Sequence, residues 1–154
     1  LYEHFKSKED ILNEAGRWCM NRELEQIHTQ MEQADGYDAM LTVCLRYLRE
    51  VMTCRMETYS ALGRYYQMTA PEQRQWVVQS KEQMKEHFRQ IAEQGRREGQ
   101  VDPALSEEVC CDILISSLIG FAVACRARCM DAAWLDRLSV SVREGLHRAL
   151  APQR

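Results

Sequence analysis

The sequence opens with LYEHFKSKEDIL, Leu1 to Leu12, and this stretch contains two helix signals in succession. Residues 1–5 span about one helical turn, which is too short to be stable alone. Ser7 then resembles the start of a capping box, with acidic residues in the positively polarised first turn that follows. We therefore interpret residues 1–6 as the end of one helix and residues 7–154 as a separate helical domain.

The composition is typical of one folded domain. The chain has 154 residues, of which 45% are apolar and 28% charged. The longest apolar run, Ile113 to Cys125, is interrupted by two serines and is short for a membrane span, and the start lacks a signal peptide. Seven cysteines, an odd number, favour reduced thiols and a cytoplasmic location. The net charge of −3 argues against nucleic-acid binding by bulk charge.

Helix signals cover almost the whole chain, and strand signals are nearly absent. Apolar residues recur at helical spacing, and turn or capping residues punctuate them. Helix starts are predicted at Ser7, near Tyr37, at Thr69, at Asp102-Pro103 and at Asp131, and a break near Gly63 divides the second segment. The sequence thus predicts an all-α fold of about six helices.

The last two predicted helices differ in kind. The final one is amphipathic, whereas the helix before it is apolar nearly all round in its second half, so it must be covered on most sides. Either a second copy of the chain covers it or its own chain wraps it. Gly120 would allow two helices to approach closely, which favours a C2 dimer through a four-helix bundle formed by the last two helices of each chain. The predicted interface is Ile113, Ser117, Gly120, Ala124, Leu135, Leu138, Val142 and Leu146.

The opening segment resembles a known junction. Tyr2, His4, Phe5, Lys8 and the pair Ile11-Leu12 match the pattern LYxHFxSKEDLL, which joins the DNA-recognition helix to the regulatory domain in TetR-family transcriptional regulators. A weaker similarity covers IAEQGRREGQVDP, Ile91 to Pro103, and between Asn13 and Gln90 only the architecture is similar. The resemblance implies that residues 1–6 end a helix-turn-helix head, most of which is absent here, and that residues 7–154 form a TetR-like ligand-binding and dimerisation domain.

The resemblance also implies that Tyr2, His4 and Lys8 contact the DNA backbone, whereas Phe5 packs the head onto the body. A lysine beside the free amides of a first helical turn suits a phosphate oxygen. The alternative is that Tyr2 is an ordinary half-buried aromatic residue and that the lysines are solvated charges.

No catalytic constellation is present. The four histidines lie on four different predicted segments, and no P-loop, GxGxxG or GxSxG motif occurs, so we expect neither an enzyme nor a cofactor.

Cys125 and Cys129 share a helix face near two arginines, which could lower a thiol pKa, but a buried cysteine is commonly a small apolar residue. The adjacent Cys110 and Cys111 point about 100° apart, which is unsuited to one metal ion.

Ligand binding is the function that remains for the helical body. The candidates lie on inward-facing stripes, where some or most could simply be core. They are Trp18, Met52, Met56, Tyr59, Trp76, Ser80, Met84, Phe88, Ser117 and Phe121. We expect a one-component TetR-type regulator, with repression as the first expectation, that binds a partly apolar effector and releases operator DNA. The alternative is a helical homodimer that acts in protein interaction or in thiol or metal sensing without DNA.

Overall fold

The computed structural model describes residues 4–55, 75–127 and 131–153, and every regular element in these residues is a helix. The elements are α1 (Lys8–Glu32), α2 (Tyr37–Glu50), a π-helical turn η1 (Val51–Arg55), α4 (Gln75–Arg97), α5 (Glu107–Arg126) and α6 (Ala132–Leu150). The predicted all-α class is confirmed. The predictions that concern Tyr2, Met56, Tyr59, the break near Gly63 and Cys129 lie outside the described residues.

Short side-chain caps begin three of the helices. Ser7 Oγ accepts a hydrogen bond from the Asp10 amide at 3.2 Å, and Asp131 Oδ1 accepts one from the Trp134 amide at 2.7 Å, both where the sequence predicts a start. The predicted start of α5 at Asp102-Pro103 is wrong, because Ser106 caps that helix and accepts from the Val109 amide at 3.2 Å.

Asp102 instead forms a turn that is tied to the end of the chain. Its carboxylate accepts from the Ala104 amide at 2.8 Å, and its own amide donates to the Leu150 carbonyl at 2.7 Å. This side-chain-stabilised turn satisfies the local backbone in a non-helical conformation, so the helix starts four residues later than predicted.

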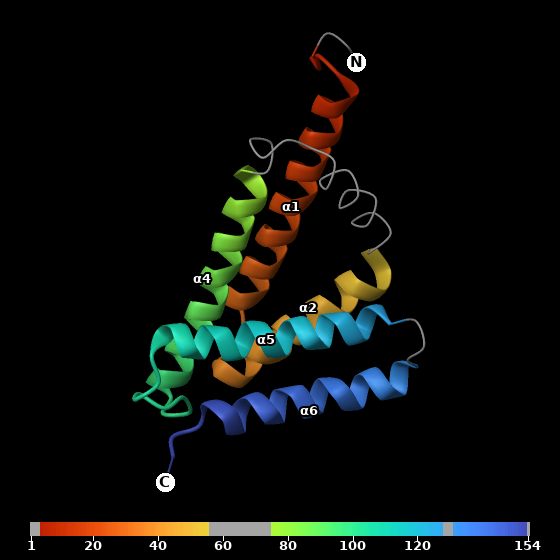
Figure 1. Ribbon diagram of the computed structural model, residues 1–154. Helices are drawn as coiled ribbons and strands as arrows, with labels where there is room; N and C mark the ends of the chain where they lie inside the picture. The colour runs from red at the N-terminus through yellow and green to blue at the C-terminus, as the bar shows by residue number, and fades with distance from the viewer. Residues whose placement is uncertain (1–3, 56–74, 128–130, 154) are drawn as a thin grey trace.

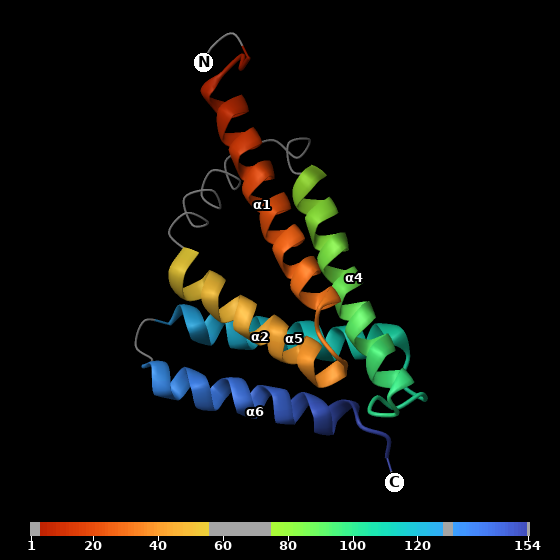
Figure 2. The ribbon, with the colours of Figure 1, turned by 180° about the vertical axis from the view of Figure 1, so that it is seen from behind.

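Figure 1 shows α1 and α4 side by side, standing on a layer in which α5 crosses beneath them, with α2 behind it and α6 alongside it. Figure 2 shows the same arrangement from behind. The first half of α1 projects beyond the other described helices (Figures 1 and 2). The core lies where the five α-helices meet, and its fully buried side chains include Met31, Tyr37, Leu41, Leu45, Ile91, Leu114, Phe121, Leu146 and Leu150.

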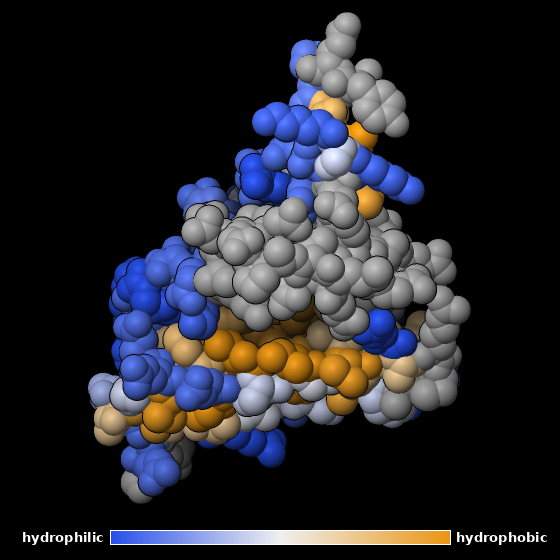
Figure 3. Space-filling model, turned by 45° about the horizontal axis from the view of Figure 1, so that its top comes forward, coloured by the Kyte–Doolittle hydropathy of each residue, from blue (hydrophilic) through white to orange (hydrophobic). Residues whose placement is uncertain are grey.

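The helix α5 is the most apolar element of the described chain. One side is buried in the core through Cys110, Leu114, Leu118 and Cys125, whereas Ile119 and Val123 are 58% and 63% exposed. In Figure 3 an apolar band runs along the exposed side of this helix. The 20 residues of α5 are long and apolar enough to cross a membrane by length and composition alone, but core helices pass the same test. The length argument from Ile113 to Cys125 therefore does not by itself exclude a span.

Candidate functional site

An apolar cavity of about 240 Å3 lies among α1, α2, α4, α5 and η1. Its exposed surface is almost wholly carbon and sulfur. The residues that line it are Glu23, Leu24, Ile27, Cys44, Tyr47, Leu48, Val51, Met52, Met84, His87, Phe88 and Leu118. Binding pockets for drug-sized ligands usually hold about 300–1,000 Å3 and are mostly apolar, so this cavity suits the apolar part of such a ligand.

Helical spacing brings the cavity residues together. Leu24 and Ile27 lie three residues apart on α1, and Cys44 and Leu48 lie four apart on α2, so each pair shares one helix face. The π-helical turn η1 follows α2 without interruption and contributes Val51 and Met52. A π-helical turn carries an extra residue for each hydrogen-bonded loop, and such turns often occur at functional sites.

Two polar groups in the wall of the cavity are satisfied within the protein. The Tyr47 hydroxyl donates to the Glu23 carboxylate and lies 3.1 Å from the Glu23 carbonyl oxygen. Cys44 Sγ lies 3.8 Å from Met31 Sδ, and burial raises the pKa of the Cys44 thiol to about 12. Since this thiol stays protonated at neutral pH, Cys44 acts as a small apolar wall residue rather than as a reactive group.

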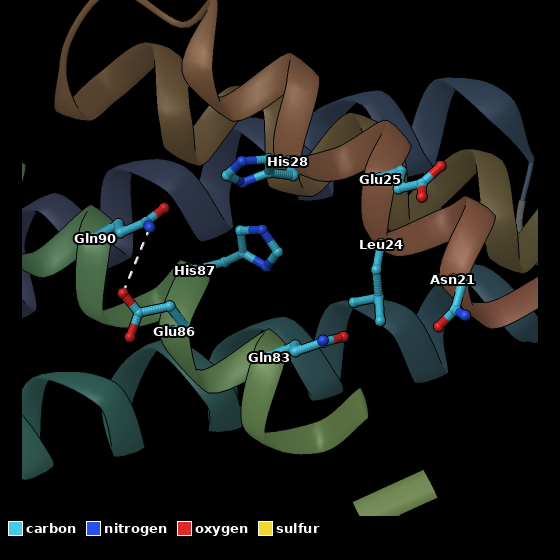
Figure 4. A pocket seen from close by; sticks show the side chains of 8 residues that line it. All are labelled: Asn21, Leu24, Glu25, His28, Gln83, Glu86, His87 and Gln90. Carbon is cyan, nitrogen blue, oxygen red and sulfur yellow. Dashed lines mark hydrogen bonds between the residues drawn. The ribbon is translucent and has the colours of Figure 1, made fainter. Parts of the chain in front are cut away.

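A second, polar hollow of about 460 Å3 lies between α1 and α4 (Figure 4). The residues that line it are Asn21, Leu24, Glu25, His28, Gln83, Glu86, His87 and Gln90. Leu24 and His87 line both the hollow and the apolar cavity, so the two spaces are neighbours across these side chains.

His87 is the one buried polar or charged side chain of the described residues, at 8% exposure. Its ring lies 5.7 Å from the His28 ring, centroid to centroid. Burial, followed by the proximity of His28, lowers the pKa of His87, so the ring is neutral at physiological pH. His28 faces Glu32, with Nε2 to Oε1 at 3.2 Å.

The predicted ligand residues separate into three groups. Met52, Met84 and Phe88 line the apolar cavity. Trp76 and Ser80 lie on α4, but their side chains are outside the description. Trp18, Ser117 and Phe121 lie elsewhere.

The positions of these three residues follow from the packing of their helices. Trp18 is on the projecting part of α1, where it is 61% exposed and Arg22 lies 5.3 Å from its ring centroid. Phe121 is buried in the core, and both Phe121 and Ser117 line a groove between α5 and α6. The apolar stripe of one helix therefore did not identify the neighbouring helix against which it packs.

Several cavity residues were not among the predicted ligand residues. Five of them lie on apolar helical stripes, namely Leu24, Ile27, Cys44, Leu48 and Leu118. The helical periodicity was therefore visible in the sequence, but it did not distinguish residues that line the cavity from residues of the core. Tyr47 and His87 were missed because only the packing of α1 against α2 and α4 turns them toward the cavity.

The groove between α5 and α6 has a volume of about 350 Å3. Of the predicted interface, it contains Ser117, Gly120, Ala124, Leu138, Val142 and Leu146. Leu135 and Leu146 are buried in the chain's own core, and Ile113, Leu138 and Val142 pack against that core. A Cβ built at Gly120 meets no atom within 4 Å, so this face is open. Dimerisation itself stays a prediction.

At the amino-terminal end, His4 and Lys8 are exposed, and Lys8 is the first residue of α1.

The described thiols of Cys111 and Cys125 have raised pKa values, chiefly because of burial. No group of three or more His, Cys, Asp or Glu residues that could hold a metal ion occurs in the described parts of the chain.

The sequence matches no protein-family model and no curated protein. Its fold is similar to the crystal structure of a transcriptional regulator FadR from Bacillus subtilis in complex with stearoyl-CoA, with a TM-score of 0.74. The match covers 97% of this chain and 80% of that chain at 17% sequence identity. A likeness at this identity establishes a shared fold.

Proposed function

We propose that this chain is the regulatory part of a one-component transcriptional regulator of the TetR type. The observation that carries the proposal is an apolar cavity walled partly by α1, the helix whose other end lies beside the segment that resembles the DNA-head junction. The shared fold with a transcriptional regulator supports it, and the ligand of that protein, stearoyl-CoA, carries a long apolar chain. We expect a cytoplasmic repressor without enzymatic activity.

The proposed mechanism uses α1 as a lever. Glu23, Leu24 and Ile27 of α1 line the cavity, so a ligand that fills it contacts the helix that leads to the head. A ligand changes operator affinity only as far as it binds one arrangement of α1 better than the other. Tyr2, His4 and Lys8 would hold the DNA backbone in the arrangement that binds operator.

The proposal also requires two copies of the chain, because a dimer sets the spacing of two heads on an operator. The open groove with Gly120, Ala124 and Ser117 suits a close approach of α5 and α6 from a second copy. Cys44, Cys111 and Cys125 give no support to the thiol-sensing alternative, because burial raises the pKa of these three thiols.

The experiment is a gel-shift assay of the full-length protein on promoter-derived DNA, with and without a long-chain amphiphile, either stearoyl-CoA or dodecyltrimethylammonium. We expect a sequence-specific shift that at least one of these amphiphiles weakens. Met52→Trp fills the cavity and should leave the shift intact but remove the ligand effect. Thr53→Trp places the same ring on the exposed side of the same turn and should respond like the wild type. Absence of any sequence-specific shift would end the proposal.

A further inference from the structure

The apolar cavity and the polar hollow meet at two side chains, Leu24 of α1 and His87 of α4. In Figure 4 both side chains extend into the space between these two helices. A molecule with one apolar end and one polar end could therefore occupy both spaces while passing His87. The surface of the cavity is almost wholly apolar, whereas the hollow is lined by amides, carboxylates and the imidazoles of His28 and His87, together with Leu24. This difference suits a molecule with one apolar and one polar end.

We propose that the cavity and the hollow form one binding site for an amphipathic molecule, with its apolar chain in the cavity and a cationic head group in the hollow beside Glu25. This inference rests on the proposed function and names the ligand class of the same site. It predicts a head group of opposite charge to that of stearoyl-CoA, the ligand of the structurally similar regulator.

The charge of the head group follows from the described lining of the hollow. That lining contains the carboxylates of Glu25 and Glu86 and no lysine or arginine. Arg89 already pairs with Glu86, whereas the Glu25 carboxylate has no ion-pair partner among the described residues. A cation in the hollow would pair with the exposed Glu25 carboxylate, and an anion would be repelled.

His87 supplies a second, independent observation. Its side chain is more than nine-tenths buried, and no described residue forms a hydrogen bond with its ring nitrogens. These nitrogens are not among the fully buried unpartnered atoms of the described residues, so they face accessible space. A ring that lines both spaces and has accessible, unpartnered nitrogens is suited to a hydrogen bond with a polar group of the ligand. The neutral imidazole offers one donor and one acceptor and adds no positive charge that would repel a cation.

The same geometry couples the head group of the ligand to α1, the helix that leads to the DNA-binding head. Glu25 belongs to α1 and His87 to α4, so a head group that contacts both would bridge the two helices. Loss of either contact would weaken binding and the coupling to operator release together.

The experiment compares three probes with the same chain, dodecyltrimethylammonium, dodecanol and dodecanoate, by titration calorimetry on the full-length protein below their micellar concentrations. We expect the cation to bind about tenfold or more tightly than dodecanoate, with dodecanol between them. Glu25→Gln should remove most of this preference. Glu14→Gln changes an exposed carboxylate of the same helix outside the hollow and should retain it.

The outcomes separate the two proposals. If dodecanoate or dodecanol binds as tightly as the cation, or if Glu25→Gln keeps the preference, the head-group inference is wrong and the apolar cavity stands as the effector site. If no probe binds and Met52→Trp changes no ligand response, the inference and the proposed function are both wrong.

Discussion

Replacement of Gly95 by alanine gives a direct test of the packing that positions α4. Gly95 is buried near the end of this helix, beneath Tyr37 and Val101. A Cβ at this position would lie 2.9 Å from Tyr37 Cδ2 and closer still to Val101 Cγ2. Carbon atoms normally pack about 3.5–4.0 Å apart, so both neighbours would have to move.

The magnitude follows from two opposed effects. Tyr37 and Val101 are 0% and 1% exposed, so neither can move into open space, and overpacking of this kind costs about 1–3 kcal/mol. Alanine in a helix interior recovers about 1 kcal/mol relative to glycine. With the overpacking cost at its upper end, Gly95→Ala should lower the free energy of unfolding by about 2 kcal/mol, or the midpoint temperature by about 4–8 °C.

The assay is urea-induced unfolding followed by circular dichroism at one fixed protein concentration. Gly145→Ala is the matched control, because it lies in the interior of α6 and a Cβ there meets nothing of its own chain within 4 Å. Since Gly145 also lines the groove of the proposed dimer, both variants are compared at a concentration at which the protein is monomeric. This control should be as stable as the wild type or up to about 1 kcal/mol more stable. A Gly95→Ala protein that equals Gly145→Ala in stability would refute the packing described around Tyr37.

Three further predictions concern buried polar groups and the open face. The Tyr37 hydroxyl is buried and has no hydrogen-bond partner among the described residues, so Tyr37→Phe should raise the free energy of unfolding by about 1 kcal/mol. A lower urea midpoint would contradict this. Because the pKa of His87 is lower in the folded than in the unfolded chain, the unfolded chain binds more protons as pH falls below about 6.5. The free energy of unfolding should therefore fall with pH from about 6.5 down to the folded pKa of His87, and His87→Gln should flatten this dependence in urea titrations at several pH values. Gly120→Leu should keep the helical content of the full-length protein, because its own chain leaves open space there, but should obstruct the close approach of a second copy. We therefore expect a shift from dimer to monomer in analytical ultracentrifugation. An unaltered dimer would argue against this face.

Local signals predicted much of the secondary structure. The caps at Ser7 and Asp131 lie where the sequence places them, because an N-cap depends on a few adjacent residues. Gly36 has a φ of 94°, which a glycine adopts readily, and it precedes α2 at Tyr37, near which the sequence predicts a helix start. The start of α5 was misplaced because the turn at Asp102 includes a bond to Leu150, and a contact so distant in the sequence leaves no local signal.

The site depended on tertiary structure to a greater extent. Met52, Met84 and Phe88 lie at the cavity and were among the candidates, because they are apolar residues on inward stripes. The same criterion selected Trp18, which is exposed because α1 extends beyond the helices that cover its second half.

The sequence by itself determined that this protein is built of helices, where several of them begin, and which faces are apolar, because caps and periodicity are properties of neighbouring residues. Only the tertiary structure decided which apolar faces meet and where they leave a cavity, since that depends on how whole helices cross. The position of His87 between an apolar and a polar space is the clearest case: nothing in the residues around it indicates the α1 side chains that it faces across the gap.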